Sequence, residues 1–210
     1  MAAGEQFAAW CEGLKRGRSY VSDGYAHALE FTVNGAAAGE RVALDKPAAV
    51  AVKAKVAFAP AGPAGAAYGG VVPKGGLRFL GDTVNLHEPR DREAVGGMRK
   101  VELVVNGIAV AEREVPADGK IHDVSFDVPI ERSSWVALRH FPQMHTNPVE
   151  VIVAGKPIRA ARKSALWCIG AIEQLWRERA RAIAPAERAE AEKTFREAMD
   201  IYRRIAAESP

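Results

Sequence analysis

Apolar and polar residues alternate along the middle of the chain. The clearest case is residues 48–58, where the apolar positions are two apart and Lys53 and Lys55 fall between them. This alternation is typical of a strand with one covered and one solvated face. Shorter stretches of the same kind occur in residues 27–33, 101–105, 108–115, 121–128, 134–140 and 149–153.

Turn signals separate these stretches. Residues 106–107 (Asn-Gly) supply the two positive φ angles that a tight hairpin turn requires, and residues 34–35 (Asn-Gly) and 118–119 (Asp-Gly) are further turn signals. A loop rich in Pro, Gly and Ala is expected over residues 60–76, and one or two short strands over 77–86. About eight or nine strands without intervening helices exclude a parallel βαβ architecture. They predict a mainly β fold, an antiparallel immunoglobulin-like β-sandwich.

The apolar spacing changes to three and four at the start of the chain. Phe7, Trp10, Cys11 and Leu14 predict a short helix over residues 5–16, and Gly17 is suited to end it. A short strand and a turn are expected to follow. We interpret this region as a junction segment that leads into the β domain.

From residue 164 the helical spacing returns and predicts a C-terminal α-helical hairpin. Ser164 is a suitable N-cap for the first helix, and Pro185 is suited to the first turn of the second. Trp176 follows the apolar stripe, whereas Trp167 falls near its edge. We therefore expect a junction at residues 1–25, a β-sandwich at 26–158 and a helical hairpin packed on it at 159–210.

Length, charge and the lengths of the apolar runs limit the classes of protein to which this chain can belong. The chain has 210 residues and a net charge of +3, with basic and acidic residues interleaved, so no nucleic-acid footprint is expected. No apolar run approaches the length of a membrane span, and the first residues lack the pattern of a signal peptide. The compartment stays open, including an extracytoplasmic one for a longer parent. Cys11 and Cys168 are expected to be buried thiols, with a disulfide between them as the alternative.

Residues 131–148, ERSSWVALRHFPQMHTNP, differ from the generic strand pattern. Trp135 is expected in the core, where truncation to alanine would cost roughly 3–5 kcal/mol; ligand stacking is the alternative. Arg132, His140, His145 and Asn147 are the candidate binding residues. The sequence His-Thr-Asn-Pro in this stretch is suited to a turn, and the same corner is a candidate binding surface.

The chain carries little that resembles a catalytic motif. None of its five histidines lies in an HxH, HExxH or HxxxH arrangement, so no metal ligand and no catalytic residue is assigned. Asp23, Tyr25 and His27 place a carboxylate, a phenol and an imidazole at one turn, which is suited to acid–base chemistry or to a solvated turn. A small metal-dependent hydrolase using His140, His145 and Asp23 is the remaining catalytic alternative.

The sequence ERSSWVALRHFPQMHTNPVEVIVAGKPIRAARKSALWC (131–168) resembles a segment near the C-terminus of a known enzyme family. This family is the carbaryl-hydrolase-like (CehA/McbA) metallohydrolases of the polymerase-and-histidinol-phosphatase (PHP) superfamily. The stretch GRSYVSDG (17–24), followed by a strand and Asn-Gly, is also similar to the segment that leaves the family's catalytic barrel. The resemblance is strongest from residue 99 onward and weaker over 18–35. Residues 87–90 (HEPR) depart from the family's pattern.

The resemblance implies that this chain corresponds to a region that follows the catalytic domain. In the family a divalent metal is held by His and acidic ligands of that preceding domain, and no stretch here matches their motifs. The resemblance therefore implies a non-catalytic accessory module without a cofactor of its own. Its partner would be a metallohydrolase catalytic domain, in cis or in trans. A free-standing carbohydrate- or protein-binding module is the alternative. The parent's substrate and the oligomeric state stay open.

Overall fold

The computed structural model describes residues 3–62, 94–141 and 143–210. The strands expected over 77–86, residues 87–90 and all but the start of the loop expected over 60–76 lie outside the described residues. The chain divides into two compact units, Met1–Lys156 and Pro157–Pro210, and each is described by itself.

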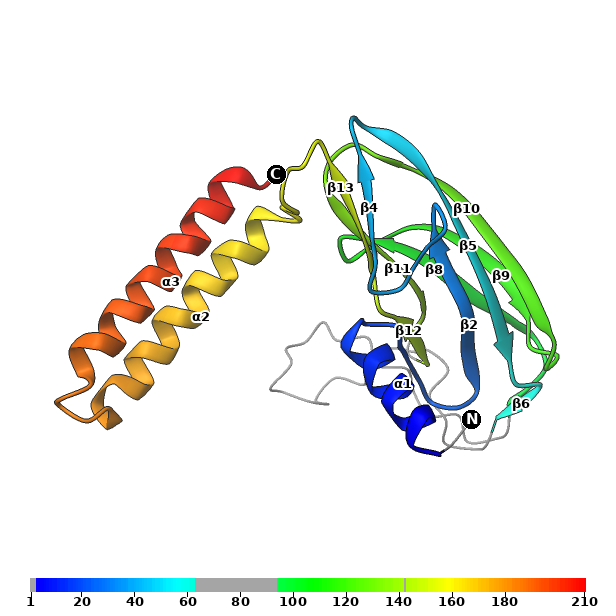
Figure 1. Ribbon diagram of the computed structural model, residues 1–210, viewed down its shortest axis with the longest axis horizontal. Helices are drawn as coiled ribbons and strands as arrows, with labels where there is room; N and C mark the ends of the chain where they lie inside the picture. Colours follow the sequence, from blue (N-terminus) through cyan, green and yellow to red (C-terminus); the bar gives the residue numbers. More distant parts are fainter. Residues whose placement is uncertain (1–2, 63–93, 142) are drawn as a thin grey trace. The chain divides into compact units, whose positions relative to one another are not determined.

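The first unit is built mainly from strands, as the alternation predicts (Figure 1). It begins with helix α1 (Ala3–Lys15). The strands are β1 (Tyr20–Ser22), β2 (Ala26–Val33), β3 (Ala36–Ala37), β4 (Arg41–Leu44), β5 (Ala48–Phe58), β6 (Ala61–Gly62), β7 (Ala94–Val95), β8 (Met98–Val105), β9 (Ile108–Pro116), β10 (Ile121–Ile130), β11 (Ser134–His140), β12 (Met144–Thr146) and β13 (Val149–Val153).

Two main sheets contain most of these strands. In the larger one, β11 pairs with β8 along one edge and with both β13 and β12 along the other, while β9, β4 and β1 extend the sheet outward. The smaller sheet has the order β10-β5-β2-β3, and β6 pairs with β7 separately. Among the described strands, β4 and β13 pair in parallel and the other pairs are antiparallel.

Both sheets turn their apolar residues into one core. In β5 the buried positions Val50, Val52, Val56 and Phe58 alternate with exposed or half-buried ones, which confirms the predicted period of two. Leu138 of the other sheet belongs to the same buried cluster. The two sheets are therefore two layers over a shared hydrophobic core, and burial of these alternate side chains holds the layers together.

The predicted Asn-Gly turns are present. Asn106 and Gly107 have φ angles of 51° and 91° and join β8 to β9, and Asn34 and Gly35 have φ angles of 47° and 84° between β2 and β3. Both residues of each turn thus take the left-handed conformation that Asn and Gly tolerate best.

Trp135 is not a core residue, so this expectation is wrong. Val136 and Leu138 take the core-facing positions of β11, and because side chains alternate along a strand, Trp135 falls on the opposite face. There the indole is half-buried and lies next to Gly107 of the β8–β9 turn. Its truncation should therefore cost less than a core substitution.

The cysteine expectations also need correction. Cys11 is exposed on α1 and Cys168 is half-buried, so the two are not both buried thiols. Both thiols are free in this structure.

The second unit is the predicted C-terminal pair of helices. Helix α2 (Arg162–Arg179) and helix α3 (Arg188–Glu208) pack on each other, with a short 3-10 turn (Ala180–Ala182) after α2. Trp176 and Phe195 meet across the pair with ring centroids 5.0 Å apart. None of the helices in the described part of the chain combines the length and apolar composition that a membrane crossing requires.

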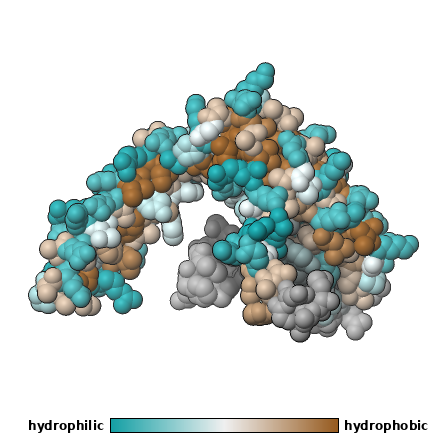
Figure 2. Space-filling model, in the orientation of Figure 1, coloured by the Kyte–Doolittle hydropathy of each residue, from teal (hydrophilic) through white to brown (hydrophobic). Residues whose placement is uncertain are grey.

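The helix starts in this unit differ from the expectations. Ser164 is not the N-cap of α2, because Ala161 occupies that position without a side-chain hydrogen bond. Pro185 lies three residues before α3 begins at Arg188. Trp167 is largely exposed, in line with its place at the edge of the stripe, and apolar side chains reach the surface of this unit among polar ones (Figure 2).

The core assignment predicts a large effect at Leu138, which is fully buried. Leu138→Ala should lower the free energy of unfolding by about 2–5 kcal/mol, because the substitution leaves a cavity. Ile108→Ala on β9, where the side chain is 69% exposed, should change it by less than about 0.5 kcal/mol. Urea denaturation followed by circular dichroism measures both. Similar losses for the two variants would contradict this core.

Candidate functional site

The structure places His140 and His145 on opposite faces of the larger sheet. Across the β11–β12 pair, Met144 lies opposite His140 and His145 lies opposite Arg139. His140 is buried on the core side, whereas His145 is exposed. Successive residues of a strand point to opposite faces, so the two imidazoles cannot ligate one metal ion. Among the described residues, no three His, Cys, Asp or Glu side chains gather into a group that could hold a metal.

Asn147 forms hydrogen bonds with the segment that follows α1. Its Nδ2 donates to the carbonyl oxygen of Gly17 and to Oγ of Ser19, both at 3.0 Å. Its backbone N–H donates to the carbonyl oxygen of Ser19 at 3.1 Å. One half-buried side chain thus holds a segment that is far away in sequence. Asn147, chosen as a binding candidate, binds the chain's own backbone.

Gly39 makes the closest contact with the same segment. Its φ of +81° is one that glycine adopts without strain, and its N–H donates to the carbonyl oxygen of Pro148 at 2.8 Å. A Cβ atom at this position would lie 1.9 Å from the carbonyl oxygen of Arg16. No side chain fits between the two backbones. We call Gly17, Gly39 and Asn147 the clamp.

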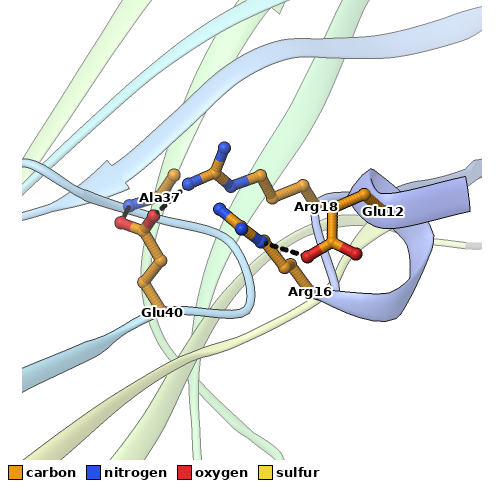
Figure 3. Close-up of polar contacts among 5 residues, drawn as sticks. All are labelled: Glu12, Arg16, Arg18, Ala37 and Glu40. Carbon is orange, nitrogen blue, oxygen red and sulfur yellow. Dashed lines mark hydrogen bonds and ion pairs between the residues drawn. The ribbon is translucent and has the colours of Figure 1, made fainter. Parts of the chain in front are cut away.

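Two ion pairs involve residues next in sequence to Gly17 and Gly39 of the clamp (Figure 3). Arg18 donates to Glu40 at 2.5 Å, and the second oxygen of Glu40 accepts the N–H of Ala37 at 2.9 Å. The Ala37 N–H first, and the Arg18 guanidinium second, hold the pKa of Glu40 below its ordinary value of 4.5. Arg16 donates to Glu12 of α1 at 2.7 Å. These pairs are exposed, so they orient the segment more than they stabilise it.

The helix held at this clamp exposes its apolar face. Phe7, Trp10 and Leu14 are 66%, 60% and 47% exposed, although their spacing of three and four places them on one side of α1. The rings of Phe7 and Trp10 stack with centroids 6.0 Å apart. An exposed apolar helix face of this kind is a candidate interaction surface. The anchored helix, α1 with the clamp, is the candidate functional site.

The serines beside Arg132 have structural roles. Ser133 is buried, and its Oγ accepts the N–H of Val153 at 2.9 Å. Oγ of Ser134 donates to the carbonyl oxygen of Arg132 at 2.9 Å and accepts from Nδ2 of Asn106 at 3.0 Å. Arg132 itself is exposed. It lies far from the anchored helix in sequence and takes no part in the hydrogen bonds described above for the clamp. The Ser-Ser-Trp motif therefore joins neighbouring strands.

The acidic turn at Asp23 is connected to the protein interior. Asp23 accepts a hydrogen bond from Nε2 of Gln143 at 2.6 Å, and Gln143 contacts His140. His27 instead meets the hydroxyl of Tyr20 at 3.0 Å. Sequence reasoning named Asp23, His27 and His140 but missed Gln143 and Gly39. An isolated Gln and one Gly among 19 carry no local signal.

Comparisons with known proteins give no relative: no protein-family model, no curated protein and no solved structure matches the chain.

The clamp predicts different outcomes for two glycines with similar backbone angles. Gly39 and Gly35 have φ angles of +81° and +84°, but a Cβ at Gly35 would meet no atom within 4 Å. Gly35→Ala should cost about 1–2 kcal/mol, the strain of a left-handed alanine. Gly39→Ala should cost about 3 kcal/mol or more, because the chain around Arg16 must also move. Thermal unfolding compares them, and equal costs would contradict the close approach.

The lowered pKa of Glu40 predicts a pH effect. A carboxylate whose pKa is depressed in the folded state stabilises that state above its ordinary pKa of 4.5, and this contribution disappears as the pH falls through the depressed value. Glu40→Gln should therefore lower the unfolding midpoint near neutral pH, and the difference from the parent should shrink in acid. Glu131→Gln, on an exposed glutamate, serves as the control. A difference that grows in acid would refute this prediction.

Proposed function

We propose that the chain is a non-catalytic accessory module of a PHP-type metal-dependent hydrolase. In this proposal, α1 packs on the catalytic domain, in the same polypeptide or in another. The exposed apolar face of α1, held at the clamp, is the observation that carries the proposal. The resemblance of residues 131–168 and 17–24 to the carbaryl-hydrolase-like family supplies the kind of partner.

The arrangement of strands supports an immunoglobulin-like sandwich as the fold of this module. One layer has the order β10-β5-β2, and the other has the order β9-β8-β11-β13. After β3 the chain changes layers, because β4 pairs in parallel with β13 before β5 returns to the first layer. Two layers of antiparallel strands with such crossings are typical of immunoglobulin-like domains.

The energetics favour α1 as a docking element. Burying a large apolar side chain stabilises an association by about 1.5–3 kcal/mol, and aromatic residues are typical anchors at the centres of interfaces. Phe7 and Trp10 stack on each other in the free chain. The clamp orders the segment that follows the helix, so less conformational entropy is lost on binding. Both effects act in the same direction.

The proposal gives the two domains different tasks. The divalent metal and its ligands belong to the catalytic domain. This module contributes an apolar helix and a rigid β scaffold beside it. His140, His145 and Asn147 then act within the module, and none of them is assigned to the reaction.

A binding experiment tests the proposal. The probe is the recombinant catalytic domain of a carbaryl-hydrolase-like enzyme from which its own C-terminal region has been deleted. The chain should bind this domain in isothermal titration calorimetry. Trp10→Ala should weaken binding about tenfold or more, since the loss of about 1.4 kcal/mol corresponds to that factor. Ile108→Ala, at a side chain that is also largely exposed but lies outside α1, should leave the affinity unchanged.

Two results would contradict the proposal. One is that the chain and the catalytic domain do not associate. The other is that both variants bind as the parent does. Saturable binding of the free chain to glycans, unaffected by Trp10→Ala, would instead support the alternative of a free-standing binding module.

A further inference from the structure

The second unit, whose residues are all described, buries few of its own apolar side chains. Its buried apolar residues are Ala165, Ala180 and Ala206, three small side chains. The larger Trp176 and Phe195, which meet between the helices, are only half-buried. Two helices alone do not enclose a core, and four-helix bundles do so by adding a second pair. The unit therefore has apolar surface to offer to a further helix.

The two helices of this unit run in opposite directions. The N–H of Arg162 at the start of α2 donates to the carbonyl oxygen of the last residue, after α3, at 2.9 Å. Leu175 comes one residue before Trp176. Thr194 likewise precedes Phe195. An α-helix turns by about 100° per residue, so both are rotated by the same angle away from the contact between the helices. Equal rotations about antiparallel axes lead to the same side of the pair.

On α3, this side of the pair carries a stripe at coiled-coil spacing. It consists of Thr194, Ala198, Ile201 and Ile205, which are separated by four, three and four residues. Ile201 is 47% exposed, and Leu175 on the same side of α2 is 50% exposed. Ala198 is small, so a second helix can approach closely. We call the four residues of the stripe the α3 seam.

Two opposite charges lie along one edge of the α3 seam. Glu197 and Arg204 each come one residue before a seam residue and are seven residues apart, so they share one edge. Together with Ile201 they line a hollow on the surface of α3. Glu197 also pairs with Lys193 at 3.8 Å, but both side chains are exposed and such a pair contributes little. Both charges can thus face a partner helix.

The order of these charges makes the surface complementary to itself. Ile201 lies close to the midpoint between Glu197 and Arg204. A twofold axis beside Ile201 would place two copies of α3 antiparallel, with Glu197 of one copy opposite Arg204 of the other on both sides of the axis. Parallel copies would instead oppose like charges, which is unfavourable. Asp200 and Arg203, the other charges of the hollow, pair with each other at 2.7 Å.

We infer that the α3 seam pairs with the α3 seam of a second copy of this chain, so that the chain forms a twofold-symmetric dimer. Burial of Ile201 against its counterpart, with Leu175 at the margin, supplies the apolar contact. Glu197 and Arg204 set the antiparallel direction. The inference does not rest on the proposed function, because α1 takes no part in it.

Sedimentation equilibrium of the full chain, at low salt and over a range of concentrations, tests the inference. The mass should rise with concentration from that of one chain, 22.6 kDa, toward twice this value. Ile201→Ala should weaken the association about tenfold or more, because both copies lose the side chain. Leu166→Ala is the matched control. Leu166 is also 50% exposed, but it follows buried Ala165 by one residue and so lies on the other side of the pair. Its truncation should leave the association unchanged.

Charge reversal tests the direction of the helices. Glu197→Arg and Arg204→Glu each place like charges opposite each other, so each should weaken the association about tenfold or more. The double variant Glu197→Arg/Arg204→Glu restores opposite signs and should associate as the parent does. A mixture of the two single variants should form mixed dimers, because one supplies positive charge at both positions and the other negative charge. Circular dichroism checks that the variants fold alike.

Three results would overturn the inference. One is the mass of a single chain at every concentration up to about 1 mM, which would leave this surface to the rest of the chain or to another protein. Another is an equal effect of Ile201→Ala and Leu166→Ala, which would place the contact elsewhere. The third is a double charge variant that associates as weakly as the single ones, which would exclude the antiparallel pairing.

Discussion

The approach of Gly39 to the backbone at Arg16 is the constraint on which the candidate site depends. Here two chain segments meet without room for a side chain, and Asn147 adds hydrogen bonds from a third segment. The clamp joins the exit of α1 to the β domain without burying any of the helix's apolar face. The apolar residues Phe7, Trp10 and Leu14 therefore stay exposed, although their spacing is typical of a helix face that is buried.

The buried polar side chains of the first unit also form hydrogen bonds within the chain. Buried Ser133 and Ser134 join strand ends, and buried His140 lies between a backbone carbonyl and Gln143. Residue types that are common in catalytic sites serve here to satisfy backbone and amide groups. The alternation of side chains separates His140 from His145, which removes the pair that the hydrolase alternative needs.

The spacing of apolar residues and the residue types at the turns predicted much of the fold. Strand β5 has the predicted bounds, because its alternating valines and lysines settle which face is buried. The Asn106-Gly107 turn followed from the φ angles that these residues tolerate. Trp135 was misplaced because size alone suggested the core, whereas Val136 and Leu138 determine the phase of the strand. Which residues of a strand face the core depends on the apolar residues before and after a given position, so one large residue does not reveal it.

The candidate site was harder to predict because its parts come from distant segments. Asn147 was named for its place before proline, but its partners Gly17 and Ser19 lie at the other end of the unit's sequence. Gly39 differs from Gly35 in its surroundings, because a Cβ atom at Gly39 would collide with the carbonyl oxygen of Arg16. Such pairings arise from the packing of the layers, which a single sequence does not contain.

Amide hydrogen exchange over residues 3–19, measured on the free chain and on its complex with the catalytic domain, tests whether α1 is an anchored docking helix. Amides near the clamp should already be protected in the free chain. Those of α1 should gain protection only on binding. Rapid exchange at the clamp in the free chain, or unchanged exchange of α1 in the complex, would contradict an anchored docking helix.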